Sequence, residues 1–108
     1  MQTIPGTLFP AMANPDDLIT TLRAIKREWS DSLGIEEMGI FGSFARGGAT
    51  EASDLDVYVR TRSPNPYLLV HLKEAIEGRV HRRVDIVRLR EQMNPLLRKR
   101  IEREGIDV

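Results

Sequence analysis

The sequence predicts an α/β fold, in which helices are layered on a β-sheet. Its 108 residues, 41% of them apolar, suffice for one hydrophobic core and one domain. Apolar residues recur with helical spacing in some segments and with strand alternation in others. These segments follow the order helix, strand, short helix, strand, helix, strand, helix. Alternating strands and helices are typical of α/β layers.

The first helix is expected to begin after Asn14. Asparagine caps helices, Pro15 fits the first helical position, and the carboxylates of Asp16 and Asp17 favour the positive end of the helix dipole. Gly34 ends the helix. Residues 1–13 are expected to form an extended lead-in, and residues 14–108 a single domain. One face of the helix is apolar and comprises Leu18, Leu22, Ile25, Trp29 and Leu33.

The middle of the chain holds two predicted strands. The first covers Ile35–Phe41 and is broken by Gly42-Ser43, after which Phe44-Ala45-Arg46 begins a short helix that ends at Gly47-Gly48. The second, over Asp54–Arg60, has the clearest alternation. Its two faces are an apolar one, with Leu55, Val57 and Val59, and another with Asp54, Asp56 and Tyr58.

The last third is predicted to contain helix, strand and helix. A turn at Ser63-Pro64-Asn65-Pro66 precedes a helix that ends near Gly78. A strand follows from Val80 or Val84 to Leu89. Asn94-Pro95 begins the final helix, which Gly105 ends. The inward residues of these two helices are expected to be Leu68, Leu69, Leu72 and Ile76 in the first, and Leu96, Leu97 and Ile101 in the second.

Composition excludes several functions. The absence of cysteine excludes a disulfide scaffold, a thiolate zinc site and a cysteine nucleophile. The 16 basic and 16 acidic residues balance, and only 6% of residues are aromatic, so direct nucleic-acid binding is not expected. No apolar run approaches the ~18 residues of a membrane span. We therefore expect a cytoplasmic protein without membrane contact.

The charges are unevenly distributed. Residues 1–78 contain 7 basic and 11 acidic residues, whereas residues 79–103 contain 9 basic and 3 acidic ones. The basic segment could guide a triphosphate or an acidic partner to a site. The favoured interpretation is that most of these arginines are solvated or lie in salt bridges.

Three features carry possible chemistry, and each has a structural alternative. Gly42-Ser43, between a strand and a helix, could present N–H groups and a hydroxyl to a phosphate, or could simply form a tight turn. Asp54 and Asp56 project from one strand face about 7 Å apart and could hold Mg²⁺, or could be solvated. Asp85 could join them if its strand pairs beside theirs, or could pair with Arg83 or Arg88.

Together the three features are the parts of a two-metal phosphoryl or nucleotidyl transfer site. The segments that carry them resemble the minimal nucleotidyltransferases of the DNA polymerase beta superfamily, over about residues 15–108. The similar segments are Gly42-Ser43-Phe44-Ala45-Arg46-Gly47, Ser53-Asp54-Leu55-Asp56-Val57-Tyr58-Val59, Val84-Asp85-Ile86-Val87 and the C-terminal helix from Asn94 to Gly105.

The resemblance implies a small mixed β-sheet flanked by helices, the polymerase-beta-like nucleotidyltransferase fold, and it implies a role for each motif residue. Gly42 and Ser43 would hold the triphosphate, and Arg46 would contact phosphate or support the loop. Asp54, Asp56 and Asp85 would be catalytic and would bind two Mg²⁺ ions. The reaction would transfer a nucleoside monophosphate, AMP from ATP, to a hydroxyl. For Arg46 alone, a salt bridge to a neighbouring carboxylate is an equal alternative.

The resemblance also implies a partner. Stand-alone members of this size are paired with HEPN-domain ribonuclease toxins, which some of them neutralise as antitoxins by attaching AMP to a tyrosine. One alternative is an antitoxin that acts by occlusion without turnover. Another is transfer to a small molecule or a tRNA end, of which the lack of an acceptor domain disfavours the small molecule. An open sheet edge would also permit homo- or hetero-oligomers.

Overall fold

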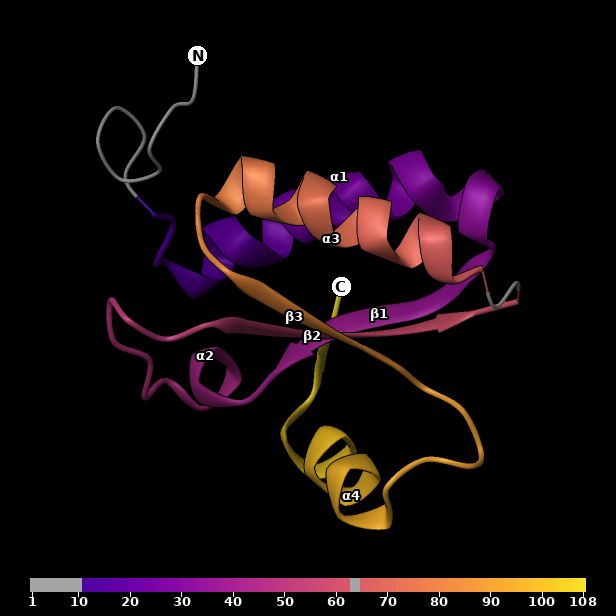
Figure 1. The fold of residues 1–108 in the computed structure, drawn as a ribbon. Coiled ribbons are helices and arrows are strands. Elements are labelled where there is room, and N and C mark those ends of the chain that lie inside the picture. The colour runs from indigo at the N-terminus through magenta and orange to yellow at the C-terminus, as the bar shows by residue number, and fades with distance from the viewer. Residues whose placement is uncertain (1–10, 63–64) are drawn as a thin grey trace.

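The computed structural model describes residues 11–62 and 65–108 as an α/β sandwich of helices and one sheet (Figure 1). Helices α1 (Pro15–Leu33) and α3 (Pro66–Val80) cover one face of the sheet, and α4 (Pro95–Glu104) lies on the other. The predicted fold class is confirmed. Most of the predicted lead-in, and Ser63-Pro64 of the predicted turn, lie outside the described residues.

The sheet has four strands in the order β3-β2-β1-β4 and is mixed. Its strands are β1 (Ile35–Phe41), β2 (Leu55–Thr61), β3 (Val84–Arg88) and β4 (Ile106–Asp107). β1 is antiparallel to β2 and to β4, whereas β2 and β3 are parallel. β4 was not predicted, because two residues are too few to show an alternation.

The three long helices begin in the same way. Asn14, Asn65 and Asn94 are each followed by proline, and each accepts hydrogen bonds from the backbone N–H groups of the second and third residues that follow. α3 continues to Val80 instead of ending near Gly78, because one glycine costs a helix only about 1 kcal/mol and Val80 is buried. None of the helices within residues 11–62 and 65–108 has the length and hydropathy of a membrane span.

The sheet has a hydrophobic core on each face. The main one lies under α1 and α3, and a smaller one under α4 contains Phe41, Tyr58, Leu89 and Ile101. Tyr58, expected on the polar face of its strand, is 3% exposed because α4 covers it. Leu96, expected on the apolar side of α4, is 74% exposed, whereas Leu97 and Ile101 pack inward as expected.

This difference along α4 predicts two different mutational effects. Ile101→Ala should lower the free energy of unfolding by about 2–4 kcal/mol, because it leaves a cavity in the smaller core. Leu96→Ala should change it by less than about 0.5 kcal/mol. Urea unfolding followed by circular dichroism measures both, and equal losses would show that α4 packs differently.

Candidate active site

Parallel pairing of β2 with β3 brings the predicted acidic residues together. The register places Asp56 opposite Asp85, on neighbouring strands and the same face of the sheet. Asp54 precedes the first residue of β2, two positions before Asp56. Asp56 is partly buried and Asp85 is exposed. The three carboxylates can converge only if β2 pairs with β3, and this pairing is present.

The charge state of Asp56 reflects this neighbourhood. Burial raises the pKa of Asp56, and the negative charges of Asp85 and Asp54 raise it further, while Arg100 and Arg46 lower it. Across the described ranges, no three ligating side chains are gathered into a ready metal cluster. The set nevertheless fits Mg²⁺, because it consists of hard carboxylate oxygens whose mutual repulsion a divalent cation would relieve.

The turn at Gly42 lies directly against the acidic pair. Gly42 has φ +76° and ψ −152°, a conformation that favours glycine. A Cβ atom at this position would lie 2.2 Å from Oδ2 of Asp56, far inside van der Waals contact. The backbone of the turn can approach the carboxylate only because residue 42 has no side chain. The predicted phosphate turn and the predicted metal ligands thus form one site.

Ser43 begins α2 (Ser43–Arg46), a helix of four residues. Its carbonyl oxygen accepts a hydrogen bond from the Gly48 N–H at 2.9 Å, which closes the short helix. Because α2 is only about one turn long, its dipole is much weaker than that of a long helix. Any anion held here would depend on the hydroxyl and N–H groups of the turn rather than on the helix dipole.

Arg46 forms the salt bridge that was the structural alternative for it. Its Nη1 lies 3.0 Å from Oε1 of Glu104, the last residue of α4. The Arg46 side chain is 51% exposed, whereas that of Glu104 is 11% exposed. A guanidinium has five N–H donors, so this pairing leaves donors on Arg46 for a phosphate.

Two residues of this region were not predicted from the sequence. Arg82 is 8% exposed, and its Nη1 donates at 2.8 Å to the carbonyl oxygens of both Glu51 and Ser53, directly before Asp54. Its guanidinium also lies 4.8 Å from the centre of the Phe44 ring. In the sequence, Arg82 and Glu104 resemble ordinary surface charges. Segments far along the chain bury them, and such burial leaves no pattern in the neighbouring residues.

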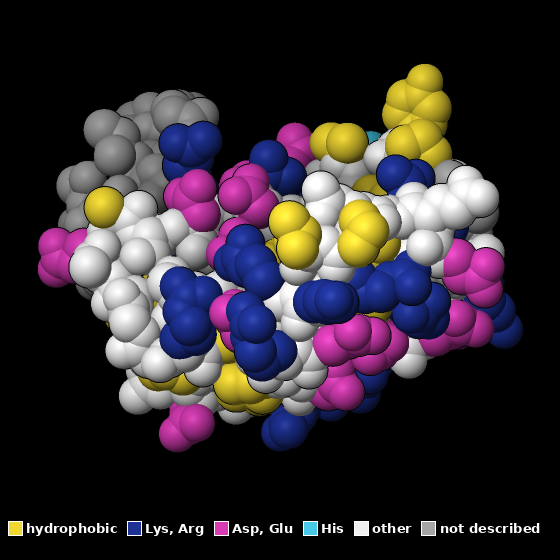
Figure 2. Space-filling view, turned by 90° about the horizontal axis from the view of Figure 1, so that it is seen from below, with side chains coloured by type: hydrophobic (Ala, Val, Ile, Leu, Met, Phe, Trp, Pro, Cys, Tyr) yellow, Lys and Arg dark blue, Asp and Glu magenta, His cyan; other side chains and the backbone are white. Residues whose placement is uncertain are grey.

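The basic segment 79–103 is not a uniform surface. Arg79 pairs with Glu28 at 2.6 Å, and Arg100 lies over the ring of Phe41 at 5.6 Å. On the face seen from the α4 side, Lys and Arg side chains alternate with Asp and Glu (Figure 2). This arrangement agrees with the favoured interpretation that most of the arginines are solvated or paired.

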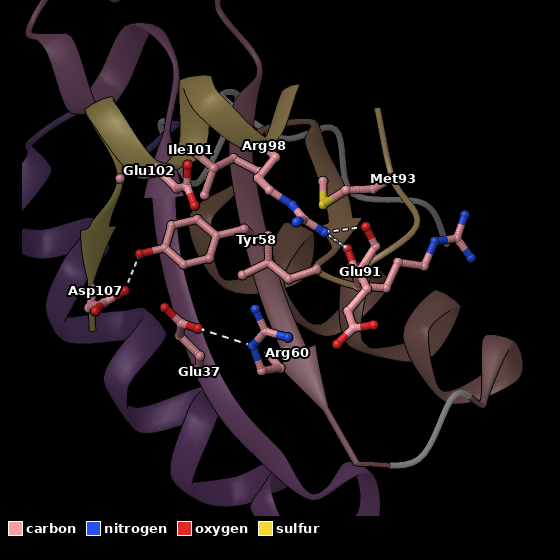
Figure 3. A pocket seen from close by; sticks show the side chains of 12 residues that line it. Glu37, Tyr58, Arg60, Glu91, Met93, Arg98, Ile101, Glu102 and Asp107 are labelled. Carbon is pink, nitrogen blue, oxygen red and sulfur yellow. Dashed lines mark hydrogen bonds and ion pairs between the residues drawn. The ribbon is translucent and has the colours of Figure 1, made fainter. Parts of the chain in front are cut away.

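A pocket of about 410 Å³ lies away from this site, between β2, β4 and α4 (Figure 3). None of the six predicted site residues lines it. Four of its polar side chains have partners within the pocket: Tyr58 donates to Asp107, and Arg60 pairs with Glu37. Asp85 instead lines a hollow of about 280 Å³ beside α3.

The fold and this arrangement of turn and carboxylates define a nucleotidyltransferase of the polymerase beta class. The chain belongs to the family described as "Polymerase beta, Nucleotidyltransferase", whose sequence model matches residues 23–108. It is 32% identical over 99 residues to the protein adenylyltransferase MntA of Thermococcus cleftensis, covering 91% of this chain and 99% of that protein.

Solved structures agree with the family. One, described as a minimal nucleotidyltransferase, is 33% identical, with a TM-score of 0.73 over 88% of this chain and 96% of that one. A toxin–antitoxin structure with AMP-PNP matches with a TM-score of 0.70 at 18% identity, over 82% of this chain and 69% of that one. A complex of a tri-AMPylated Shewanella oneidensis HEPN toxin with its MNT antitoxin matches with a TM-score of 0.65 at 16% identity, over 86% and 70%. At these two lower identities the likeness concerns the fold.

Proposed function

We propose that this nucleotidyltransferase is a Mg²⁺-dependent protein adenylyltransferase that moves AMP from ATP to a tyrosine hydroxyl of a HEPN-domain toxin, and so acts as an antitoxin. One observation carries the proposal: the Gly42 turn contacts Asp56, which lies in register with Asp85. A turn suited to phosphate and carboxylates suited to a divalent cation are therefore adjacent. The similarity to a protein adenylyltransferase supports the choice of a protein acceptor.

Each site residue has a role in the proposal. Asp54, Asp56 and Asp85 would hold two Mg²⁺ ions, which when bound would neutralise the charge that develops on the phosphate oxygens. The N–H groups and hydroxyl of Gly42 and Ser43 hold the triphosphate. The donors of Arg46 that Glu104 leaves unused would contact the triphosphate.

The chemical step is a substitution at the α-phosphorus of ATP. The acceptor oxygen forms a bond to this phosphorus while the bond to the pyrophosphate oxygen breaks, so AMP is transferred and pyrophosphate leaves. Asp85, the most exposed of the three carboxylates, accepts the proton of the acceptor hydroxyl. Its position on the edge strand β3 leaves room for a protein acceptor to approach.

The experiment that tests the proposal separates transfer from occlusion. The chain and its genomic neighbour are co-expressed, with wild-type Asp54 and Asp56 and with the double variant Asp54→Asn/Asp56→Asn. We expect the variant complex to purify intact while growth inhibition by the partner returns. Full neutralisation by the variant would contradict the transfer mechanism and support occlusion.

A further inference from the structure

The Glu104 carboxylate lies at the junction of the nucleotide turn and the C-terminal helix. Its Oε1 is 3.0 Å from Nη1 of Arg46, and its Oε2 is 3.6 Å from Arg103. The Gly42 N–H lies beside this carboxylate and favours its charged form. Burial disfavours its ionised form, yet Arg46 and the Gly42 N–H outweigh burial and lower the pKa of Glu104. The carboxylate is therefore held in its charged form.

Gly42 consequently lies between two carboxylates from different parts of the chain. Asp56 occupies the space where its side chain would be, and Glu104 lies beside its N–H. The turn is thus fixed on one side by a metal-ligand candidate and on the other by α4. The sequence of the turn itself does not determine where the turn lies relative to Asp56 and α4.

Glu104 is in turn fixed by the C-terminal segment. The Gly105 N–H donates to the Ile101 carbonyl oxygen at 2.7 Å, and β4 pairs with β1 directly afterwards. The Glu104 side chain is 11% exposed, so neighbouring residues enclose it. A carboxylate anchored in this way orients its partners and does not compete with a triphosphate for them.

We infer that Glu104 is a positioning residue for nucleotide transfer: it holds the Gly42 turn against Asp56 and aims the free donors of Arg46 at the triphosphate. This inference rests on the proposed function. It assigns to the C-terminal helix a part in building the nucleotide site, in addition to covering the smaller core.

The test compares Glu104→Ala, Glu104→Gln and Arg46→Ala in steady-state transfer and in calorimetric binding of Mg²⁺–AMP-PNP, at a temperature where each is folded. We expect Glu104→Ala to lower kcat/KM for ATP about 10- to 100-fold. Glu104→Gln should recover part of the loss, since its amide oxygen can accept from both donors. The double variant Arg46→Ala/Glu104→Ala should lose less than the sum of the two single losses, because Glu104 acts in part through Arg46.

Glu102→Ala is the matched control, because Glu102 is an exposed carboxylate on the same helix, two positions earlier. It should leave kcat/KM unchanged. Tighter AMP-PNP binding by Glu104→Ala would overturn the inference, since it would show that Glu104 competes with the triphosphate. Additive losses, or wild-type kinetics for Glu104→Ala, would also overturn it while leaving the proposed function intact. A wild-type chain that neither binds nor transfers nucleotide would overturn both.

Discussion

Asp54→Asn and Asp56→Asn should each lower the rate of AMP transfer at least about 10³-fold, equivalent to about 4 kcal/mol of transition-state stabilisation. Asparagine has nearly the same shape as aspartate but lacks the negative charge that would hold Mg²⁺ beside the triphosphate. The rate is measured with ATP and excess Mg²⁺ by pyrophosphate release. Near wild-type rates in either variant would show that this residue is not a metal ligand.

Asp56→Asn should also make the folded protein more stable at pH 7 without Mg²⁺. The pKa of Asp56 is raised in the folded state by burial and by Asp85 and Asp54, so ionisation of Asp56 opposes folding. The wild type therefore loses stability as pH rises from the ordinary value of 3.8 through the raised pKa. The stability gained by the variant should grow across that window and stay constant above it.

Thermal unfolding across pH, with and without Mg²⁺, measures this effect. Mg²⁺ should raise the Tm of the wild type and leave that of Asp56→Asn nearly unchanged, because binding to the folded state stabilises it by mass action. A variant less stable than the wild type at neutral pH would contradict the assignment of Asp56 as a repelled, partly buried carboxylate.

Gly42→Ala should impair both folding and catalysis. The added Cβ would lie 2.2 Å from Oδ2 of Asp56, and the backbone would retain a φ of +76°. Together these effects should lower the free energy of unfolding by about 2–4 kcal/mol. Because the turn and the carboxylate must separate, kcat/KM for ATP should also fall about 100-fold.

Alanine variants of two nearby glycines distinguish backbone strain from the clash with Asp56 as the cause of the effects at Gly42. Gly47 has φ +79° with open space around its Cβ position, so Gly47→Ala should cost about 1 kcal/mol of backbone strain. Gly48 has neither feature, and Gly48→Ala should be nearly neutral. Chemical unfolding and ATP kinetics of the three variants measure the differences. Equal effects at Gly42 and Gly47 would show that the contact with Asp56 is unimportant.

The sequence predicts what depends on local pattern. The Asn-Pro helix starts, the alternation around Leu55 and the positions of the acidic residues are all set by neighbouring residues. The turn at Gly42 was predicted for the same reason, since glycine and serine after a strand indicate a sharp break. The sequence placed Asp85 near Asp56 only on the condition that their strands pair. Whether they pair depends on the order of the strands, which is a property of the whole chain.

The remainder depends on contacts between distant segments. Tyr58 is buried because α4, some forty residues later in the sequence, covers it. Arg82 is buried because its guanidinium replaces missing hydrogen bonds in the segment before Asp54. The pairing of Arg46 with Glu104 joins residues that are 58 positions apart. No spacing rule connects such pairs.

The intact mass of the partner protein is the most direct test of AMP transfer to it. The purified chain and its genomic neighbour are incubated with Mg²⁺ and, separately, with each nucleoside triphosphate. Adenylylation of the partner predicts that the neighbour gains one or more AMP masses with ATP, that tandem mass spectrometry places them on tyrosine, and that Asp54→Asn/Asp56→Asn abolishes the gain. An unchanged partner mass with every triphosphate, in a complex that still forms, would contradict it.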